Sequence, residues 1–231
     1  MQRKIRLMIG ILIMTGLIAG CWKVSKNLQK ELKEEMETIG EAEKSDRIVV
    51  LDAGHGGTDS GKVGINGVKE KDINLTITNS VKKILEKENI QVIMTRETDE
   101  QLAQSKVEDL KYRVSLMNEK KPSLAVSIHQ NSYHEENVFG AQVFYYKTST
   151  EGKKAAAVIQ EALQEVNPEN TKKIKANDTY YLLKKTEVPT VIVECGFLSN
   201  YAEAEKLVSE DYQKKVAEAV TKGILQYLKD Q

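Results

Sequence analysis

The chain has few cysteines, prolines and aromatic residues, and its basic residues only balance its acidic ones. Its two cysteines among 231 residues are Cys21, in the apolar N-terminal segment, and Cys195, so no structural disulfide is expected in the body. Three prolines and 6% aromatic residues leave room for many helices. Residues 24–231 carry 30 basic and 34 acidic groups without a basic patch, which argues against a nucleic-acid partner.

The N-terminus lacks an apolar run of the ~20 residues needed to span a bilayer. Gln2 to Arg6 is basic and Leu7 to Ala19 is largely apolar, so residues 1–23 have the pattern of an export signal. Ile18-Ala19-Gly20-Cys21 is similar to a bacterial lipoprotein cleavage box. A lipoprotein, an uncleaved anchor and a secreted protein all remain open. All three place the body outside the cytoplasmic membrane, and the first two give it an N-terminal membrane association.

Residues 24–46 are predicted to form a helical stalk or linker, and residues 47–231 a single globular domain of adequate length for a real core. Apolar residues recur at helical spacing in the stalk, at Val24, Leu28, Leu32, Met36 and Ile39. In the domain, apolar runs predict strands at 48–51, 91–95, 124–128, 141–146 and 188–193. Amphipathic patterns predict helices at 75–88, 105–119, 153–166, 203–207 and 211–228. This alternation predicts an α/β domain, its largely parallel sheet covered by helices on both faces.

Candidate functional residues follow the apolar strands. His55 comes just after the strand at 48–51, in the turn Ala53-Gly54-His55-Gly56-Gly57, and His129 and Glu194 follow two later strands. The carboxyl end of a strand is where open α/β sheets bind ligands. The glycine-rich turn lacks both the Lys-Ser/Thr pair of a phosphate-binding loop and the dinucleotide fingerprint. Taken singly, each of these histidines could be a solvated or hydrogen-bonded side chain.

Two carboxylates complete the set. Glu70 lies just before the helix predicted at 75–88, where the helix dipole alone would favour an acid. Glu194 ends a buried run, where a carboxylate is costly without a charged neighbour or a metal. Two imidazoles, one carboxylate and a water are the ligand set of a hydrolytic zinc site. The second carboxylate would then serve as general base and proton donor, but spacing alone does not say which glutamate has which task.

Long sequence blocks resemble the zinc-dependent N-acetylmuramoyl-L-alanine amidase family. They are VVLDAGHGGTDSGKVGINGVKEKDINL, SIHQNS and VPTVIVECGFLSN, with a weaker match at Met94–Asp99 and around Arg113. The resemblance covers Arg47 to Tyr227. It implies a mixed, mostly parallel six-stranded sheet, zinc (Zn2+) held by His55, Glu70 and His129, and Glu194 as the catalytic carboxylate.

The implied reaction is cleavage of the amide between the lactyl group of muramic acid and L-alanine, so the expected partner is peptidoglycan. Within the family, the chain resembles small germination-specific amidases that act on the spore cortex and lead to muramic-δ-lactam. This implies a cellular location between the forespore and mother-cell membranes. Asn131, close to His129, is a candidate substrate contact. Open alternatives are a vegetative wall amidase, another zinc peptidoglycan hydrolase and a non-catalytic wall-binding module. An accessory activator protein is a further partner that the sequence leaves open.

Overall fold

The computed structural model describes residues 14, 16, 20–33 and 47–231, and the chain divides into two units, Met1–Lys44 and Ser45–Gln231. In the first unit, residues 20–33 form a helix, which starts in the predicted export segment and includes residues 24–33 of the predicted stalk. The rest of the stalk, residues 34–46, and most of the predicted export signal lie outside the described residues. No helix in the described part of the chain has the length and apolar character needed to cross a membrane.

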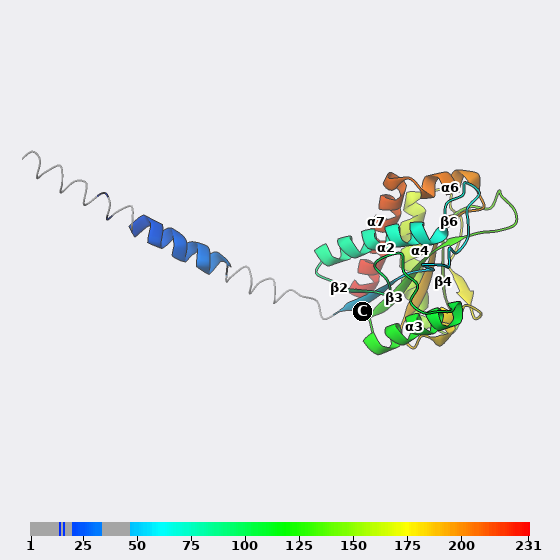
Figure 1. The fold of residues 1–231 in the computed structure, drawn as a ribbon, viewed down its shortest axis with the longest axis horizontal. Helices are drawn as coiled ribbons and strands as arrows, with labels where there is room; N and C mark the ends of the chain where they lie inside the picture. Colours follow the sequence, from blue (N-terminus) through cyan, green and yellow to red (C-terminus); the bar gives the residue numbers. More distant parts are fainter. Residues whose placement is uncertain (1–13, 15, 17–19, 34–46) are drawn as a thin grey trace, which may run out of the picture. The chain divides into compact units, whose positions relative to one another are not determined.

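The second unit is built on a six-stranded sheet with the strand order β2-β1-β3-β6-β4-β5 (Figure 1). Strands β2, β1, β3 and β6 are parallel, β4 pairs antiparallel with β6, and β5 is parallel to β4. The predicted α/β class with a mixed, mostly parallel sheet is therefore confirmed. The strands are β1 Ile48–Ala53, β2 Gln91–Met94, β3 Leu124–Asn131, β4 Gln142–Tyr146, β5 Lys175–Asn177 and β6 Thr190–Phe197.

Helices cover the two faces of the sheet unequally. The larger core cluster joins one face to α2, α4 and α7, through side chains such as Ile77, Ile159 and Val220. The smaller cluster joins the other face to α3 and α5, through Met117 and Leu182. Figure 1 shows α2, α4 and α7 grouped together and α3 on the opposite side of the sheet. The helices are α2 Glu70–Lys87, α3 Lys106–Lys120, α4 Thr150–Val166, α5 Tyr181–Lys185, α6 Tyr201–Leu207 and α7 Glu210–Lys229.

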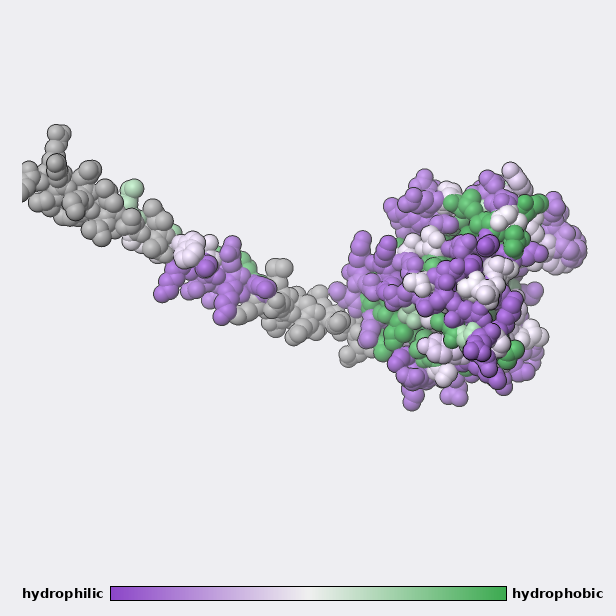
Figure 2. Space-filling view, in the orientation of Figure 1, coloured by the Kyte–Doolittle hydropathy of each residue, from purple (hydrophilic) through white to green (hydrophobic). Residues whose placement is uncertain are grey.

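Alternation along the strands decides which residues face the smaller cluster. Val50, Ala125 and Ile192 belong to that cluster, and Asp52, His129 and Glu194 lie an even number of residues further along the same strands. All three therefore project from the lightly covered face, towards the carboxyl ends of β1, β3 and β6. The outer surface of the unit is mainly hydrophilic in the view of Figure 2, with apolar side chains in small areas.

Three predicted boundaries were wrong in instructive ways. Helix α2 begins at Glu70 rather than at residue 75, and β3 and β6 continue beyond His129 and Glu194 instead of ending before them. Polar residues at these ends conceal the continuation of regular structure, because the prediction followed apolar periodicity. Strand β5 and helix α5 were missed, since both are short and β5 is largely exposed.

Candidate metal centre

Three strands bring polar side chains together on the lightly covered face. His129 in β3 is paired directly with Glu194 in β6, and Gln142 in β4 pairs with Glu194 from the other side. The β3–β6 register shifts between His129 and Asn131. His55 follows β1 in a loop whose backbone remains attached to β3, because the Gly54 amide donates to the Ile128 carbonyl over 3.1 Å. The two histidines, far apart in sequence, therefore meet at the carboxyl ends of β1 and β3.

His55, Glu70 and His129 converge on one point. The distance from His55 Nε2 to Glu70 Oε1 is 3.2 Å, and His129 Nδ1 lies 2.9 Å from the same oxygen. The two imidazole rings meet edge to face with their centroids 5.0 Å apart. One ligand atom from each residue lies within 4.8 Å of the other two, so a single ion could contact all three.

Glu70 reaches this point from the first turn of α2, whose amides are satisfied by an adjoining loop. The Glu70 amide donates to the Lys62 carbonyl and the Lys71 amide to the Ser60 carbonyl. These distant acceptors replace a side-chain cap, which explains why the start of α2 carries no sequence signal. The Glu70 carboxylate is also fixed, because Oε2 accepts from the Lys62 amide at 2.8 Å and Oε1 from the Gln130 amide at 3.1 Å.

Two glycines make room for the converging side chains. A Cβ on Gly54 would lie 2.3 Å from His129 Cε1, far inside contact distance. Gly61 has φ +65°, and a Cβ there would lie 2.6 Å from both Glu70 Oε2 and His55 Cδ2. Only glycine permits these close approaches, and at Gly61 also the left-handed backbone.

Glu70 and His129 stabilise each other's charged forms. Burial alone would raise the pKa of Glu70, but hydrogen bonds from His129 and His55 outweigh it and hold that pKa well below the ordinary range. Burial likewise would lower the pKa of His129, but Glu70 outweighs it and raises that pKa to about 9. Glu70 is therefore an anion at neutral pH, held by contacts with both imidazole rings.

Glu194 is different from Glu70, because burial dominates its environment. The residue is 7% exposed, and its Oε2 has no hydrogen-bond partner among the described residues. Burial raises the pKa of Glu194 to about 7. A buried carboxylate without a partner is costly in a folded protein and needs an explanation beyond packing.

Two buried arginines hold the loop that carries His55, and sequence reasoning assigned neither a role. Arg113 Nη2 donates to the His55 carbonyl at 2.7 Å, and its Nη1 reaches Asp52 at 2.6 Å and the Ala53 carbonyl at 2.8 Å. Arg96 donates to the carbonyls of Ala53 and Gly54. Arg113 was visible in the sequence only as part of the family resemblance, because its partners in the His55 loop lie about 60 residues away.

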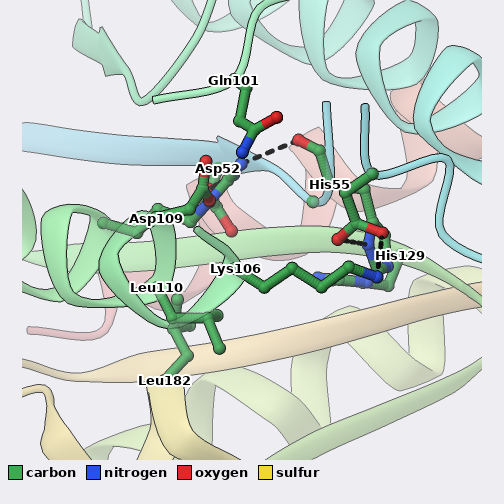
Figure 3. Close-up of a pocket in the computed structure, with 11 residues that line it drawn as sticks. Asp52, His55, Gln101, Lys106, Asp109, Leu110, His129 and Leu182 are labelled. Carbon is green, nitrogen blue, oxygen red and sulfur yellow. Dashed lines mark hydrogen bonds and ion pairs between the residues drawn. The ribbon is translucent and has the colours of Figure 1, made fainter. Parts of the chain in front are cut away.

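A pocket of about 250 Å³ opens beside His55 and His129, on the side of α3 (Figure 3). Leu110 and Leu182 supply apolar walls, and Gln101 and Lys106 supply polar ones. The pocket touches the converging histidines directly and has the position expected of a substrate subsite.

The remaining predicted residues have less to do with this point. Asn131 is half-buried at the end of β3, and its Oδ1 accepts from the adjacent Ser132 amide at 2.8 Å, so its substrate contact stays a prediction. The third histidine of the chain, His134, has a side chain that is 72% exposed and lies beside Glu135. Cys195 is fully buried, and burial raises the pKa of its thiol far above the ordinary value, which agrees with a packed thiol rather than a nucleophile.

Comparisons with known proteins show which family the chain is similar to. Residues 49–226 match the family model for N-acetylmuramoyl-L-alanine amidase. The germination-specific N-acetylmuramoyl-L-alanine amidase of Bacillus subtilis is 40% identical over 191 residues, covering 79% of this chain and 80% of that protein.

Solved structures agree. The CwlD amidase from Clostridioides difficile, in complex with the GerS lipoprotein, is 38% identical with a TM-score of 0.78, covering 80% of this chain and 100% of that one. The catalytic domain of CwlV, an N-acetylmuramoyl-L-alanine amidase from Bacillus (Paenibacillus) polymyxa var. colistinus, is 32% identical with a TM-score of 0.72, covering 80% and 99%.

Proposed function

The chain belongs to the N-acetylmuramoyl-L-alanine amidase family, and on that premise we propose that it is a zinc-dependent hydrolase of peptidoglycan. The bond cleaved is the amide between the lactyl group of muramic acid and L-alanine. The observation that carries this proposal is the convergence of His55, Glu70 and His129 beside Glu194, whose buried Oε2 has no hydrogen-bond partner among the described residues.

The donor set fits zinc. Two imidazole nitrogens and one carboxylate oxygen are the three protein ligands typical of a hydrolytic zinc site, with one position left for water or substrate. Glu70 is already ionised and both of its oxygens are fixed by hydrogen bonds, so little reorganisation is needed. His55, Glu70 and His129 would hold the zinc ion, which would supply Lewis acidity for polarising a carbonyl and lowering the pKa of water.

Glu194 is proposed to transfer a proton from water to the leaving nitrogen. Its carboxylate takes a proton from the attacking water and then delivers that proton to the alanine nitrogen as the amide bond breaks. A pKa near 7, caused by burial, suits a group that must both accept and release a proton at neutral pH. The pairing of Glu194 with His129 across β6 and β3 keeps this carboxylate next to the proposed metal ligands.

The test is digestion of purified peptidoglycan by the wild type and by Glu194→Gln, with mass analysis of the products. The wild type should free intact stem peptides from lactyl groups. Glu194→Gln should retain zinc and lose at least about 100-fold in rate, because proton transfer contributes that much or more. Glu169→Gln, an exposed glutamate on the loop after α4, is the matched control.

Other outcomes identify the rival functions. Unchanged hydrolysis by Glu194→Gln would remove Glu194 from the mechanism. Cleavage of another wall bond by the wild type would identify a different zinc peptidoglycan hydrolase. Binding of the wall without turnover would identify a non-catalytic module.

The substrate is proposed to be spore cortex, and the product to lead to muramic-δ-lactam for germination. The support is the 40% identity to the germination-specific amidase of Bacillus subtilis. Spores lacking this protein should then lack muramic-δ-lactam in their muropeptide profile, while the vegetative wall is unchanged. A change confined to the vegetative wall would favour the alternative substrate.

An extracytoplasmic, membrane-associated location is proposed, with residues 1–23 as a signal and membrane anchor or a lipoprotein signal, 24–46 as stalk and 47–231 as catalytic domain. An accessory activator protein is proposed as well, since the structure of the related CwlD amidase is that of a complex with the GerS lipoprotein. Labelling of cells with a fatty-acid analogue separates the membrane alternatives: Cys21→Ser should abolish incorporation if the chain is a lipoprotein, and no incorporation by the wild type indicates an anchor or secretion.

A further inference from the structure

Side chains outside the proposed metal set hold His55 in place. His55 has φ 63°, in the left-handed region that residues other than glycine rarely occupy. Directly after it the chain turns back, because Gly56 and Asp59 exchange two backbone hydrogen bonds of 3.0 Å each. This tight turn returns the carboxylate of Asp59 to the side of the His55 ring.

Asp59 contacts the ring nitrogen that faces away from Glu70. His55 Nδ1 lies 2.8 Å from Asp59 Oδ2, while His55 Nε2 lies 3.2 Å from Glu70 Oε1. A carboxylate is only an acceptor, so Nδ1 must carry the proton of this hydrogen bond. In a neutral imidazole the lone pair then resides on Nε2, the nitrogen that points towards Glu70 and His129.

The Asp59 carboxylate is itself held at its second oxygen. Oδ1 accepts from Lys106 Nζ at 2.7 Å and from the Gly61 amide at 3.3 Å. Lys106 is the first residue of α3, and Figure 3 shows its side chain extending across the pocket towards the two histidines. Engagement of both oxygens opposes rotation of the Asp59 carboxylate, so the His55 ring is oriented by a chain of contacts that begins on α3.

We propose that Asp59, fixed by Lys106, is a positioning residue that selects the Nδ1-protonated form of His55 and presents Nε2 to the metal. The inference rests on the proposed function, since it takes zinc held by His55, Glu70 and His129 as its premise. Hydrogen-bonded partners of metal-bound histidines typically contribute a factor of about 10 to 100 in metal affinity.

The test measures zinc affinity of the purified full-length protein by competition with a chromophoric chelator. Asp59→Ala should weaken zinc binding by about 10- to 100-fold. Asp59→Asn should weaken it less, because an amide oxygen still accepts from Nδ1, and Lys106→Met should also weaken it less than Asp59→Ala. Asp211→Asn at the start of α7 and Lys111→Met on α3, both exposed, are the matched controls and should leave affinity unchanged.

Two further measurements separate positioning from a merely structural role. The thermal midpoint of the metal-free protein should be nearly the same for Asp59→Ala and the wild type. Nitrogen-15 shifts of the zinc-loaded wild type should show metal at Nε2 and a proton at Nδ1 of His55, which is easily resolved because the chain has only 3 histidines.

Several results would overturn the inference. They are a zinc affinity of Asp59→Ala within twofold of the wild type, a lowered affinity matched by a large drop in the metal-free thermal midpoint, or metal bound at Nδ1 of His55. The first of these, with a wild type that binds zinc and hydrolyses the wall, removes the role of Asp59 and leaves the proposed function standing. A wild type that binds no zinc removes both.

Discussion

Replacement of Arg113 by methionine is expected to lower the free energy of unfolding by about 3–5 kcal/mol, the usual cost of removing one partner of a buried ion pair. Arg113 is 2% exposed and Asp52 1% exposed, and their side chains meet at 2.6 Å. Without the guanidinium, Asp52 keeps only the hydroxyl donors of Ser127 and Thr95. The loss is a large fraction of the 5–15 kcal/mol that stabilises a typical domain.

A second substitution tests the physical cause. If an uncompensated buried charge is what makes the Arg113→Met variant unstable, Asp52→Asn in the same chain should restore at least about 1 kcal/mol, because pairs in contact are not additive. The assay is urea unfolding of the metal-free protein at neutral pH, followed by circular dichroism. A loss below about 1 kcal/mol in Arg113→Met, or simple additivity in the double variant, would refute the reasoning.

Three other predictions follow from the same geometry. Removal of metal by a chelator should abolish hydrolysis with little change in circular dichroism, because the cores pack through apolar side chains; global unfolding would instead indicate a structural metal. Gly54→Ala should weaken zinc binding by about tenfold or more, because its Cβ would lie 2.3 Å from His129 Cε1, and an unchanged affinity would contradict the placement of that ring. Burial would raise the pKa of Asp52, but Arg113, Ser127 and Thr95 outweigh it and lower that pKa from 3.8 to about 2, which corresponds to about 2 kcal/mol of stability. Because the pKa of Asp52 is lower in the folded state, this stability is present above about pH 4 and is lost as the pH falls towards 2. Urea unfolding of the metal-free wild type should therefore show a free energy of unfolding that falls with acid, and the fall should be smaller in Asp52→Asn.

The sequence predicted the sheet and the convergence of His55 and His129 because both follow directly from the strand pattern. Apolar runs locate β1, β3 and β6, and parallel strands bring their carboxyl ends to one edge. Local pattern could not predict the start of α2 at Glu70, because its first amides bond to carbonyls of residues 60 and 62 rather than to a nearby cap.

The residues that hold the site in place were harder to predict. Arg96 and Arg113 act on a loop that lies about 40 to 60 residues away in the sequence, and no periodicity connects them to it. Asp59 is close to His55 in sequence but becomes its partner only through the turn at Gly56. Supporting residues of this kind depend on three-dimensional pairing, whereas His55 and His129 come directly after apolar strand runs that the sequence marks.

Helix α2 belongs both to the larger core and to the candidate metal centre. Its apolar side, including Ile73 and Ile77, is packed into the larger core with α7, while its first residue, Glu70, meets the two imidazoles. A core substitution that shifts this helix along its axis would therefore move an oxygen of the metal centre without altering any residue near the substrate. Selection for wall-cleaving activity therefore also acts on apolar core residues. The packing of α2 against α7 sets the position of Glu70 and so affects catalysis.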